Sequence, residues 1–589
     1  MYEILREVWN ELTAPGAPFE VSEIEVRGVP VKAYARAPAT LRELWLGSAL
    51  HGDKDYLVYE DERWTYAQAH AEVAAVAGWL AAHGVEPGDR VAIAMRNYPE
   101  WMLSHWASVS MGATVVGMNA WWTGPELLYG VRDAEPKVMI CDAERLARFL
   151  PHAAEAPRCT LVAVRVAARA GAPPPEGVID WSQLRLSGAS LPEAEIDPDD
   201  DACIFYTSGT TGHPKGAQLT HRGCTNNVFS LAFVNLCQAA ALDRAAALDR
   251  AAALARDAAL ARAGSERPAA QSGPPPQAAA LITTPLFHVT ANNCVAQSMT
   301  LAGGKLVHMY KWDAGEALKL VERENLTMVS GVPTMVRELI SHPDFPKYDT
   351  SSLKGLGGGG AQLQPDLVKK IAAQGGGAQP NTGYGMTETC GIITAVASKF
   401  FVGKPASAGP AMPVFEARCV DAEGREVGVN EIGELWVRGA QVIRGYLNRP
   451  EATAETITEG WLHTGDVARI DEDGFIFIVD RMKDMVLRGG ENVYCAEVEA
   501  AIFDHEDVDE CAVFGVADDR LGEEVGAAVV LRERSALSAE AIREHCAPRL
   551  ARYKIPRYIW LLSDPLPRNA SGKFLKKQLR DELDPSEAV

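Results

Sequence analysis

The sequence lacks any long apolar run: no hydrophobic stretch approaches the ~18–20 residues needed to cross a bilayer. It also lacks CxxC pairs, and its eleven cysteines are spread from Cys141 to Cys546, which predicts reduced, mostly buried thiols rather than disulfides or a zinc site. Basic clusters are missing too, because 57 Lys and Arg against 78 Asp and Glu give a net charge of −21. A nucleic-acid binder would show a concentrated basic face, so this class is excluded.

The first residues, from Met1 to Glu7, lack the basic start and apolar centre of a signal peptide. We therefore expect a cytoplasmic protein without a transmembrane segment, while a peripheral membrane contact and the oligomeric state stay open. The composition, 47% hydrophobic and 23% charged, is typical of a globular protein. A chain of 589 residues is too long to fold around a single hydrophobic core, so we expect several folding units. Together with the composition, this favours an enzyme.

Helical and extended patterns alternate in the first part of the chain, which indicates parallel sheets with helical crossovers. The expected helices are 67–83 and 126–132, and the expected strands are 91–94 and 138–140. Between about Gly403 and Arg481, short alternating segments broken by Gly, Asn and Asp predict an antiparallel sheet or small barrel. The chain after Arg481 has the size of a small α+β domain, with helices expected near 496–503 and 539–550 and a strand near 512–516.

One segment differs from the rest: residues 239–262 repeat Ala, Leu, Asp and Arg, with leucines at 242, 248, 254 and 260. These residues favour a helix. A six-residue step turns by about 240° on a helix, so the leucines form no apolar stripe, and we expect this helix to be exposed or frayed. A Pro-rich linker follows up to Gln277. We interpret residues 239–277 as a surface insertion.

The segment from Tyr206 to Gly216 is rich in Gly, Ser and Thr and follows an expected strand at 202–205. Backbone N–H groups and hydroxyls at this density can surround phosphate oxygens, and Lys215 adds a positive charge. It is not the P-loop pattern, because Gly216 stands where that pattern has Ser or Thr. The expected phosphate contacts are Thr207, Ser208, Gly209, Thr210, Thr211, Gly212 and Lys215.

This segment resembles the signature of the adenylate-forming superfamily, which contains acyl- and aryl-CoA synthetases, firefly luciferase and the adenylation domains of nonribosomal peptide synthetases. The resemblance extends from about Thr65 to Lys573, with residues 239–277 as the main departure. It implies an α/β protein: a large N-terminal domain of two parallel α/β subdomains and a small antiparallel β subdomain, then a small, mobile α+β C-terminal domain. The implied limits are 1–481, with the β subdomain at 403–481, and 482–589.

The resemblance also assigns nucleotide contacts to motifs that follow in the family's order. Gly359, Gly360 and Ala361 resemble the adenine loop, and the segment Asn381–Thr389 resembles a second nucleotide motif. In that motif Tyr384 would pack on adenine beside Gly385 and Met386, Thr387 would contact a phosphate, and Glu388 would hold Mg²⁺. Asp466 would bind the ribose hydroxyls, with Arg481 as a second ribose or phosphate contact.

The remaining implied residues belong to the small domain and the acid site. Lys483 occupies the hinge position, and Gly489, Gly490 and Glu491 resemble the loop that faces the active site in a second conformation. Lys573 resembles the catalytic lysine, and His288 lies where acyl and aryl synthetases have a gate or a neighbour of the carboxylate. The implied catalytic residues are thus Lys573, Glu388, Thr387 and His288.

The implied reaction is the formation of an acyl-adenylate from a carboxylic acid and ATP with Mg²⁺, followed by acyl transfer to coenzyme A. Amino-acid substrates are disfavoured because no aspartate lies near His288 to pair with an ammonium group. We expect a largely apolar acyl pocket, with residues from 229–235, 290–294 and 331–334. The open alternatives are an acyl-AMP ligase that loads a carrier protein, an aryl-CoA ligase and a catalytically silent adenylate-binding protein.

Overall fold

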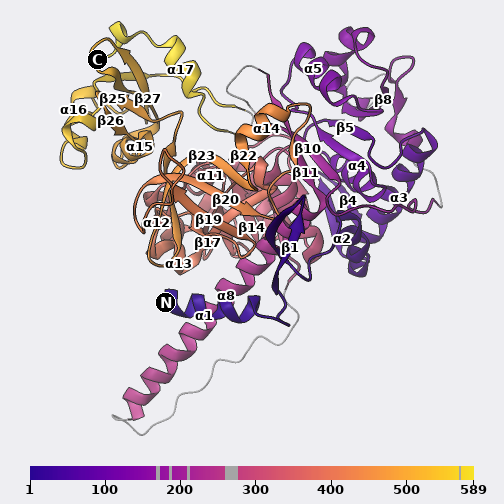
Figure 1. The fold of residues 1–589 in the computed structure, drawn as a ribbon, viewed down its shortest axis with the longest axis horizontal. Coiled ribbons are helices and arrows are strands. Elements are labelled where there is room, and N and C mark those ends of the chain that lie inside the picture. The colour runs from indigo at the N-terminus through magenta and orange to yellow at the C-terminus, as the bar shows by residue number, and fades with distance from the viewer. Residues whose placement is uncertain (167–172, 185–188, 208–212, 259–275, 533, 570–571) are drawn as a thin grey trace.

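The structure is a computed structural model that describes residues 1–166, 173–184, 189–207, 213–258, 276–532, 534–569 and 572–589. Its described part contains two large mixed sheets, an antiparallel sheet and a small separate α+β body (Figure 1). The fold class predicted from the sequence is therefore confirmed. The helices are α1 Tyr2–Thr13, α2 Leu41–Gly47, α3 Tyr66–Ala82, α4 Pro99–Ser110, α5 Gly124–Ala134, α6 Ala143–Phe149, α8 His221–Ala258, α9 Ser298–Ala302, α10 Ala314–Glu324, α11 Pro333–Ile340, α12 Pro365–Gln374, α13 Ser398–Gly403, α14 Pro450–Thr456, α15 Cys495–Phe503, α16 Ala539–Cys546 and α17 Lys576–Glu582.

The first large sheet has a parallel centre, as the alternating sequence pattern predicted. Its order is β21 Gly445–Tyr446, β11 Lys215–Thr220, β10 Asp201–Thr207, β6 Thr114–Gly117, β5 Arg90–Ala94, β7 Val138–Asp142, β8 Thr160–Val164 and β9 Ile179–Asp180. The strands from β10 to β9 run parallel, whereas β11 and β21 are antiparallel additions at one edge. This edge carries Lys215 and Tyr446.

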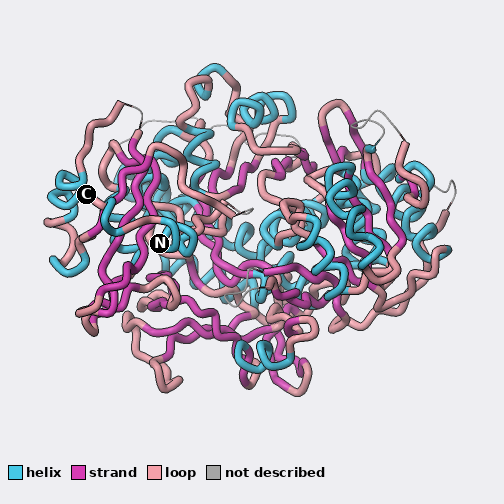
Figure 2. The backbone as a smooth tube through the Cα atoms, turned by 90° about the horizontal axis from the view of Figure 1, so that it is seen from above, coloured by secondary structure: helices cyan, strands magenta, loops and turns pink. Residues whose placement is uncertain are grey.

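The second large sheet is also parallel at its centre. Its order is β17 Gly391–Ala397, β16 Gln379–Met386, β15 Gly355–Gly358, β14 Met328–Gly331, β12 Ala279–Ile282, β13 Lys305–His308, β3 Asp55–Tyr59 and β4 Glu62–Thr65. Helices lie beside the strands of both large sheets (Figure 2). The carboxyl ends of β15 and β16 lead into the glycine loop and into the segment with Glu388, so this edge holds two of the predicted motifs.

The remaining sheets are largely antiparallel. In the larger domain the order is β18 Gly409–Pro410, β24 Phe475–Arg481, β23 Trp461–Ile470, β20 Gly433–Gly439 and β19 Phe415–Val420, with β22 Ile457–Thr458 beside β23, and β1 Val21–Val26 pairs with β2 Val29–Tyr34. The small body contains β26 Glu491–Val493, β25 Val486–Arg488, β28 Gly522–Leu531 and β27 Val508–Asp518, with β29 Tyr558–Leu562 parallel to β28. Separate clusters of buried apolar side chains lie on the two faces of this last sheet.

Helix α3 shows how local chemistry sets an element boundary. Thr65 accepts a hydrogen bond from the N–H of Gln68 at 3.2 Å, and the Gln68 side chain accepts one from the N–H of Thr65 at 2.9 Å. This reciprocal pair satisfies two N–H groups at the helix start. Apolar residues at helical spacing, among them Val73 and Leu80, are fully buried in the main core. The helix expected over 67–83 is thus observed, one residue earlier at its start.

Helix α8 joins the interior of the protein to the repeat segment. Its buried Asn226 accepts a hydrogen bond from the N–H of Tyr34 at 2.9 Å, and Asn227 accepts one from the N–H of Ile392 at 2.9 Å. Farther along, Ala241 is still buried, Arg244 pairs with Glu11 of α1 at 2.6 Å, and Leu248 is 55% exposed. The helix then leaves the body of the molecule (Figure 1). The predicted repeat helix is therefore the outer end of a core helix and is anchored at its start.

Part of α8, His221–Leu248, is long and apolar enough to cross a membrane by length and composition, and no other described helix is. Its buried asparagines hold strands β2 and β17 through the hydrogen bonds given above. These contacts anchor the first turns of the helix inside the protein, and 28% of its most apolar window is buried. The predicted Pro-rich linker lies outside the described residues up to 275, and Gln277 donates to the carbonyl of Asp55 at 2.7 Å.

The buried amide of Gln238 provides a test of this anchoring. Its Oε1 accepts from the N–H of Ala397 at 2.8 Å, and its Nε2 donates to the carbonyl of Ala395 at 3.4 Å. We expect Gln238→Ala to lower the free energy of unfolding by about 1–3 kcal/mol, because a backbone N–H loses its partner. Urea unfolding followed by fluorescence measures this change. The exposed Arg244→Ala serves as control with a smaller effect, and equal effects of the two variants would contradict the anchoring.

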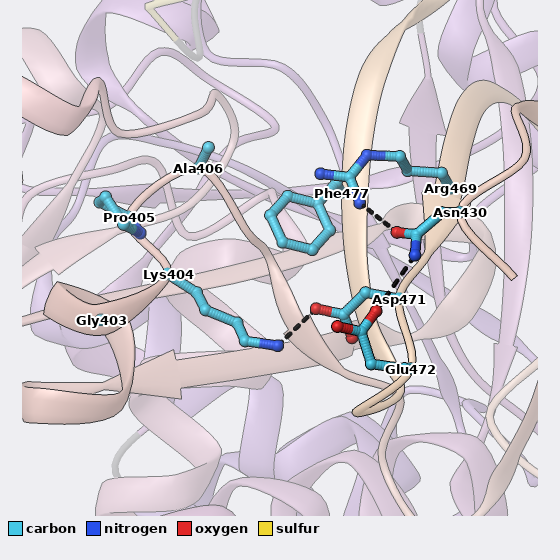
Figure 3. Close-up of a pocket in the computed structure, with 9 residues that line it drawn as sticks. All are labelled: Gly403, Lys404, Pro405, Ala406, Asn430, Arg469, Asp471, Glu472 and Phe477. Atoms are coloured by element: carbon cyan, nitrogen blue, oxygen red, sulfur yellow. Dashed lines mark hydrogen bonds and ion pairs between the residues drawn. The ribbon is translucent and has the colours of Figure 1, made fainter.

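All eleven cysteines are free thiols, and nine of them are buried, as the sequence predicted. The cavity drawn in Figure 3 has a volume of about 410 Å³ and lies between the end of α13 and strands β23 and β24. Lys404 pairs with Asp471 beside it, and Arg469 lies over the ring of Phe477 at 3.9 Å. The cavity contains none of the predicted site residues. Besides the pair of Lys404 and Asp471, Arg469 and Glu472 both bond to the side chain of Asn430.

Candidate active site

The predicted phosphate loop connects two antiparallel strands at the edge of the first sheet. Thr207 ends β10 and Lys215 begins β11, and the Thr207 hydroxyl donates to the Lys215 carbonyl at 3.4 Å. Next to the loop, Tyr129 stacks on His213 with ring centroids 4.6 Å apart. The predicted contacts Ser208, Gly209, Thr210, Thr211 and Gly212 lie outside the described residues. The ends of the loop thus place Lys215 at the sheet edge.

Glu388 lies close to Lys215 although 173 residues separate them in the sequence. Strand β16 ends at Met386, and Thr387 and Glu388 form the short turn that follows. The Glu388 side chain is buried and accepts a hydrogen bond from the hydroxyl of Tyr446 at 2.8 Å. The ring of the same tyrosine lies 4.4 Å from the Lys215 ammonium. One tyrosine therefore connects the predicted metal ligand with the predicted phosphate lysine.

The glycines of the two nucleotide motifs allow close backbone packing. A Cβ on Gly385 would lie 1.9 Å from the carbonyl oxygen of Gly391 on the neighbouring strand. Gly360 has a φ of 84°, a backbone conformation that favours glycine, and a Cβ there would lie 3.9 Å from Cε of Lys573. The loop of Gly359, Gly360 and Ala361 is thus open enough for Lys573 to reach it.

Asp466 is held by two neighbours from opposite sides. The Tyr384 hydroxyl donates to one carboxylate oxygen at 2.6 Å, and the Arg481 Nε lies 3.1 Å from the other. Asp466 and Arg481 face each other because they are paired residues of β23 and β24. Burial, followed by the negative charge of Asp466, raises the pKa of Tyr384 well above its usual value, so the phenol stays a donor. Three predicted nucleotide residues therefore form one hydrogen-bonded group.

Lys573 brings the small domain to this group. It lies at the end of a turn in which the Asn569 side chain accepts from its N–H at 3.0 Å, and the adjacent Gly572 packs on Val332 of the large domain. Burial in the cleft lowers the pKa of Lys573 to about 8, and the positive charge of Arg481 adds to this effect. The carboxylates of Asp466 and Glu388, together with Asp484, act in the opposite direction and favour the charged ammonium.

His288 is the residue of the large domain that approaches Lys573 from the expected acid site. Burial lowers the pKa of His288 to about 4, and the nearby positive charge of Lys573 contributes to this. The imidazole is therefore neutral at pH 7. The structure thus brings together predicted residues from both domains: Lys215, Tyr384, Glu388, Asp466, Arg481, Lys573 and His288.

A second group of predicted residues has its described contacts inside the small domain. Gly489 and Gly490 form the turn of the β25–β26 hairpin, and Glu491 begins β26. The N–H of Gly489 donates to the carbonyl of Leu521 at 2.8 Å, also in the small domain. Lys483 is exposed and lies between β24 and β25. In this structure the turn at Gly489 contacts Leu521 of its own domain, and Lys573 is the residue of the small domain that lies in the cleft.

Sequence reasoning missed Tyr446 and Asp484. Phe229 and Phe233 were expected in the acyl pocket, but their rings pack against Phe19 and Tyr34 at centroid distances of 5.5–6.4 Å. Both rings pack in the apolar cluster that also contains Phe19 and Tyr34, where Phe233 is buried and Phe229 is partly buried. That this part of α8 lines an acyl pocket stays a prediction.

The donor set is suited to a magnesium ion that also binds phosphates. No group of three or more His, Cys, Asp or Glu side chains that could hold a metal occurs in the part of the chain that the structure describes. Glu388 is joined to Lys215 through Tyr446, and an ion held by this one carboxylate would take most of its oxygen ligands from phosphates and water. Mg²⁺ is commonly bound in this way, by one or two carboxylates and substrate phosphates.

Comparisons with known proteins agree with this geometry. The family model described as AMP-binding enzyme matches residues 47–447, and its C-terminal domain model matches residues 497–573. The chain is 35% identical to feruloyl-CoA synthase of an Amycolatopsis species, covering 88% of this chain and 93% of the relative. It is 33% identical to the long-chain-fatty-acid–CoA ligase FadD13 of Mycobacterium tuberculosis, covering 89% and 93%.

Solved structures lead to the same family. The ATP-bound structure of MatB from Rhodopseudomonas palustris matches with a TM-score of 0.75 and 28% identity, covering 92% of this chain and 98% of the other. The CoA ligases of this family use ATP, Mg²⁺ and coenzyme A. With both family models matched and these relatives similar over nearly their full length, the chain belongs to the AMP-binding enzyme family as an AMP-forming acid–CoA ligase.

Proposed function

We propose that this enzyme activates an apolar carboxylic acid as an acyl-adenylate, with release of pyrophosphate, and then transfers the acyl group to coenzyme A. The observation that carries the proposal is the position of Lys573. This lysine of the small domain lies against the Gly360 loop of the large domain, and its charge acts on His288 and is favoured by the carboxylates of Asp466 and Glu388. An ammonium at this point can bridge a nucleotide phosphate and an incoming carboxylate.

The first step requires an acid carboxylate to approach the α-phosphate of ATP, and both are negative. Two unit charges 4 Å apart repel by about 4 kcal/mol at an effective dielectric of 20. The ammonium groups of Lys215 and Lys573 would offset this repulsion and stabilise the charge that develops on the transferred group. A magnesium ion on Glu388 would neutralise further phosphate charge. Thr387 would add a hydroxyl contact to a phosphate.

The nucleotide base and sugar would occupy the rest of the cleft. Tyr384 and the loop at Gly360 would contact the adenine, and Asp466 with Arg481 would bind the ribose. Each of these residues lies within one connected group around Lys573. For the second step, Lys573 would leave the cleft by rotation at Lys483, and the turn at Gly489 would approach. Lys483 is suited to this because it is exposed in the connection between β24 and β25.

An apolar acid is favoured over an amino acid by the surroundings of His288. The neighbouring residues from Thr284 to Gln297 contain no carboxylate, and several of them, such as Leu286, Phe287 and Val295, are buried apolar side chains. An unpaired ammonium would be costly there. The relatives named above act on a feruloyl group and on long-chain fatty acids, so both aromatic and aliphatic acids belong in the test.

The test is pyrophosphate release and AMP release with a panel of fatty, alicyclic and aromatic acids, each with and without coenzyme A. We expect at least one apolar acid to give exchange of labelled pyrophosphate into ATP, and coenzyme A to be required for multiple turnover. Turnover with a phosphopantetheine carrier but not with coenzyme A would favour a carrier-loading ligase. Exchange with none of the acids, in the presence of Mg²⁺, would contradict the proposed function.

A further inference from the structure

Tyr446 stands on a short edge strand that is fixed from several directions. Strand β21 pairs with β11 so that Tyr446 lies opposite Ala217, and its N–H donates to the Thr453 hydroxyl at 2.9 Å. The next residue, Leu447, donates its N–H to the carbonyl of Gly216 at 2.8 Å. The side chain is 7% exposed. This backbone is therefore tied to the end of the phosphate loop rather than to a free surface.

The side chain of Tyr446 contacts two charged groups of the site. Its hydroxyl donates to Oε1 of Glu388 at 2.8 Å, and its ring faces the Lys215 ammonium at 4.4 Å. A main-chain hydrogen bond also joins the segment before Tyr446 to Glu388: the N–H of Ile443 donates to the carbonyl of Glu388 at 3.0 Å. Because a carboxylate only accepts, the hydroxyl of Tyr446 is the donor in its contact with Glu388.

We propose that Tyr446 is a positioning residue that sets the orientation of the Glu388 carboxylate and the Lys215 ammonium toward the phosphates of ATP. The inference rests on the proposed function, in which these two groups bind magnesium and phosphate. A hydrogen bond to Oε1 fixes the rotation of the carboxylate and leaves Oε2 for a cation. The aromatic face holds the ammonium on the same side, without neutralising it as a carboxylate would.

Not every buried tyrosine donates its hydroxyl to a charged side chain. Tyr66, for example, is fully buried, and its hydroxyl donates to the backbone carbonyls of Gly304 at 2.8 Å and Met299 at 3.2 Å. Loss of that hydroxyl would affect packing and stability without reaching a charged side chain. Tyr66→Phe is therefore a matched control: the same atom is removed from the same large domain, away from the residues assigned to ATP.

The experiment measures Mg²⁺-dependent ATP binding by calorimetry on the full chain, which requires no acid substrate. We expect Tyr446→Phe, which keeps the ring over Lys215, to weaken magnesium-dependent binding by roughly 10–100-fold, the usual effect of losing a group that orients a metal ligand. Tyr66→Phe should leave it within about twofold. In a Glu388→Gln background, Tyr446→Phe should have almost no further effect, because the hydroxyl acts through that carboxylate.

Two results would overturn the proposal: an unchanged magnesium dependence in Tyr446→Phe, or an equal loss with and without the Glu388 carboxylate. A second variant, Tyr446→Leu, also removes the ring and should weaken ATP binding further even without magnesium. Thermal unfolding shows whether each of the two tyrosine variants is folded. If only one of them folds, its ATP binding with and without magnesium still tests the proposal. Failure of pyrophosphate exchange in the unaltered enzyme would instead contradict the proposed function, since ATP binding is measured separately.

Discussion

Replacing Lys573 by alanine is expected to lower acid-dependent pyrophosphate exchange by roughly 10²–10³, the usual effect of removing one group that stabilises developing charge. Lys573 lies beside His288 and in the field of Asp466 and Glu388, so its ammonium is the cation that the small domain adds to the cleft. Exchange of labelled pyrophosphate into ATP, at saturating acid, measures the loss. Lys577→Ala, an exposed lysine of the same tail, is the control and should leave exchange unchanged.

The same variant separates the two half-reactions. Thioester formation from supplied acyl-adenylate and coenzyme A should be far less affected, because Lys573 would leave the cleft before this step. An equal loss in both half-reactions would refute this division of roles. The pH profile gives a further check: with a pKa of about 8, the Lys573 ammonium loses its proton as the pH rises through 8. The kcat/KM of adenylation should decline there, and Lys573→Arg should move that decline to higher pH.

Lowering the pH from 6.5 toward 4 is expected to lower the free energy of unfolding of this protein strongly, because the protein contains buried histidines. Burial lowers the pKa of His105 and His308 to about 3 and that of His221 to about 4. One ring nitrogen of each has no hydrogen-bond partner among the described residues, so an added proton would have no acceptor. The unfolded chain binds protons below pH 6.5, whereas the folded chain does not until pH 3–4.

The stabilisation is therefore complete above pH 6.5 and is lost as the pH falls toward 4. Each histidine contributes about 1.4 kcal/mol per pH unit, so the three together cost roughly 6 kcal/mol between pH 6.5 and pH 5. Urea unfolding at a series of pH values measures the slope. Burial also lowers the pKa of His70 and His288 to about 4, so His105→Gln should reduce the slope by about a fifth. His83→Gln, which alters an exposed ring, is the control and should not change it. A slope that is the same in all variants would show that other groups govern acid unfolding.

Local patterns predicted most elements well because their causes are local. Thr65 and Gln68 define the start of α3, and the period of buried residues defines its length. An antiparallel sheet or small barrel between about Gly403 and Arg481 was also expected from short alternating segments. In the sheet that forms there, β23 pairs with β24 and places Asp466 opposite Arg481. The nucleotide motifs were assigned by resemblance, and the structure brings Tyr384, Glu388, Asp466, Arg481 and Lys573 together.

Contacts between distant segments could not be predicted in the same way. Tyr446 is 58 residues from Glu388, and nothing in the residues around it indicates that a strand will place it on that carboxylate. The direction of Phe229 and Phe233 depends on Phe19 and Tyr34, which come from another part of the chain. The repeat in α8 has no apolar stripe, yet its first residues are held because α1 crosses them. Tertiary neighbours decided each of these cases.

The carboxylate of Asp466 has one partner on each oxygen, Tyr384 on one and Arg481 on the other. Each oxygen has a second lone pair, so a sugar can donate further hydrogen bonds to a carboxylate whose direction is already fixed. A vicinal diol can donate two such bonds, whereas a 2′-deoxy sugar can donate one. The cleft would thereby distinguish ribonucleotides from deoxyribonucleotides by the second of these hydrogen bonds.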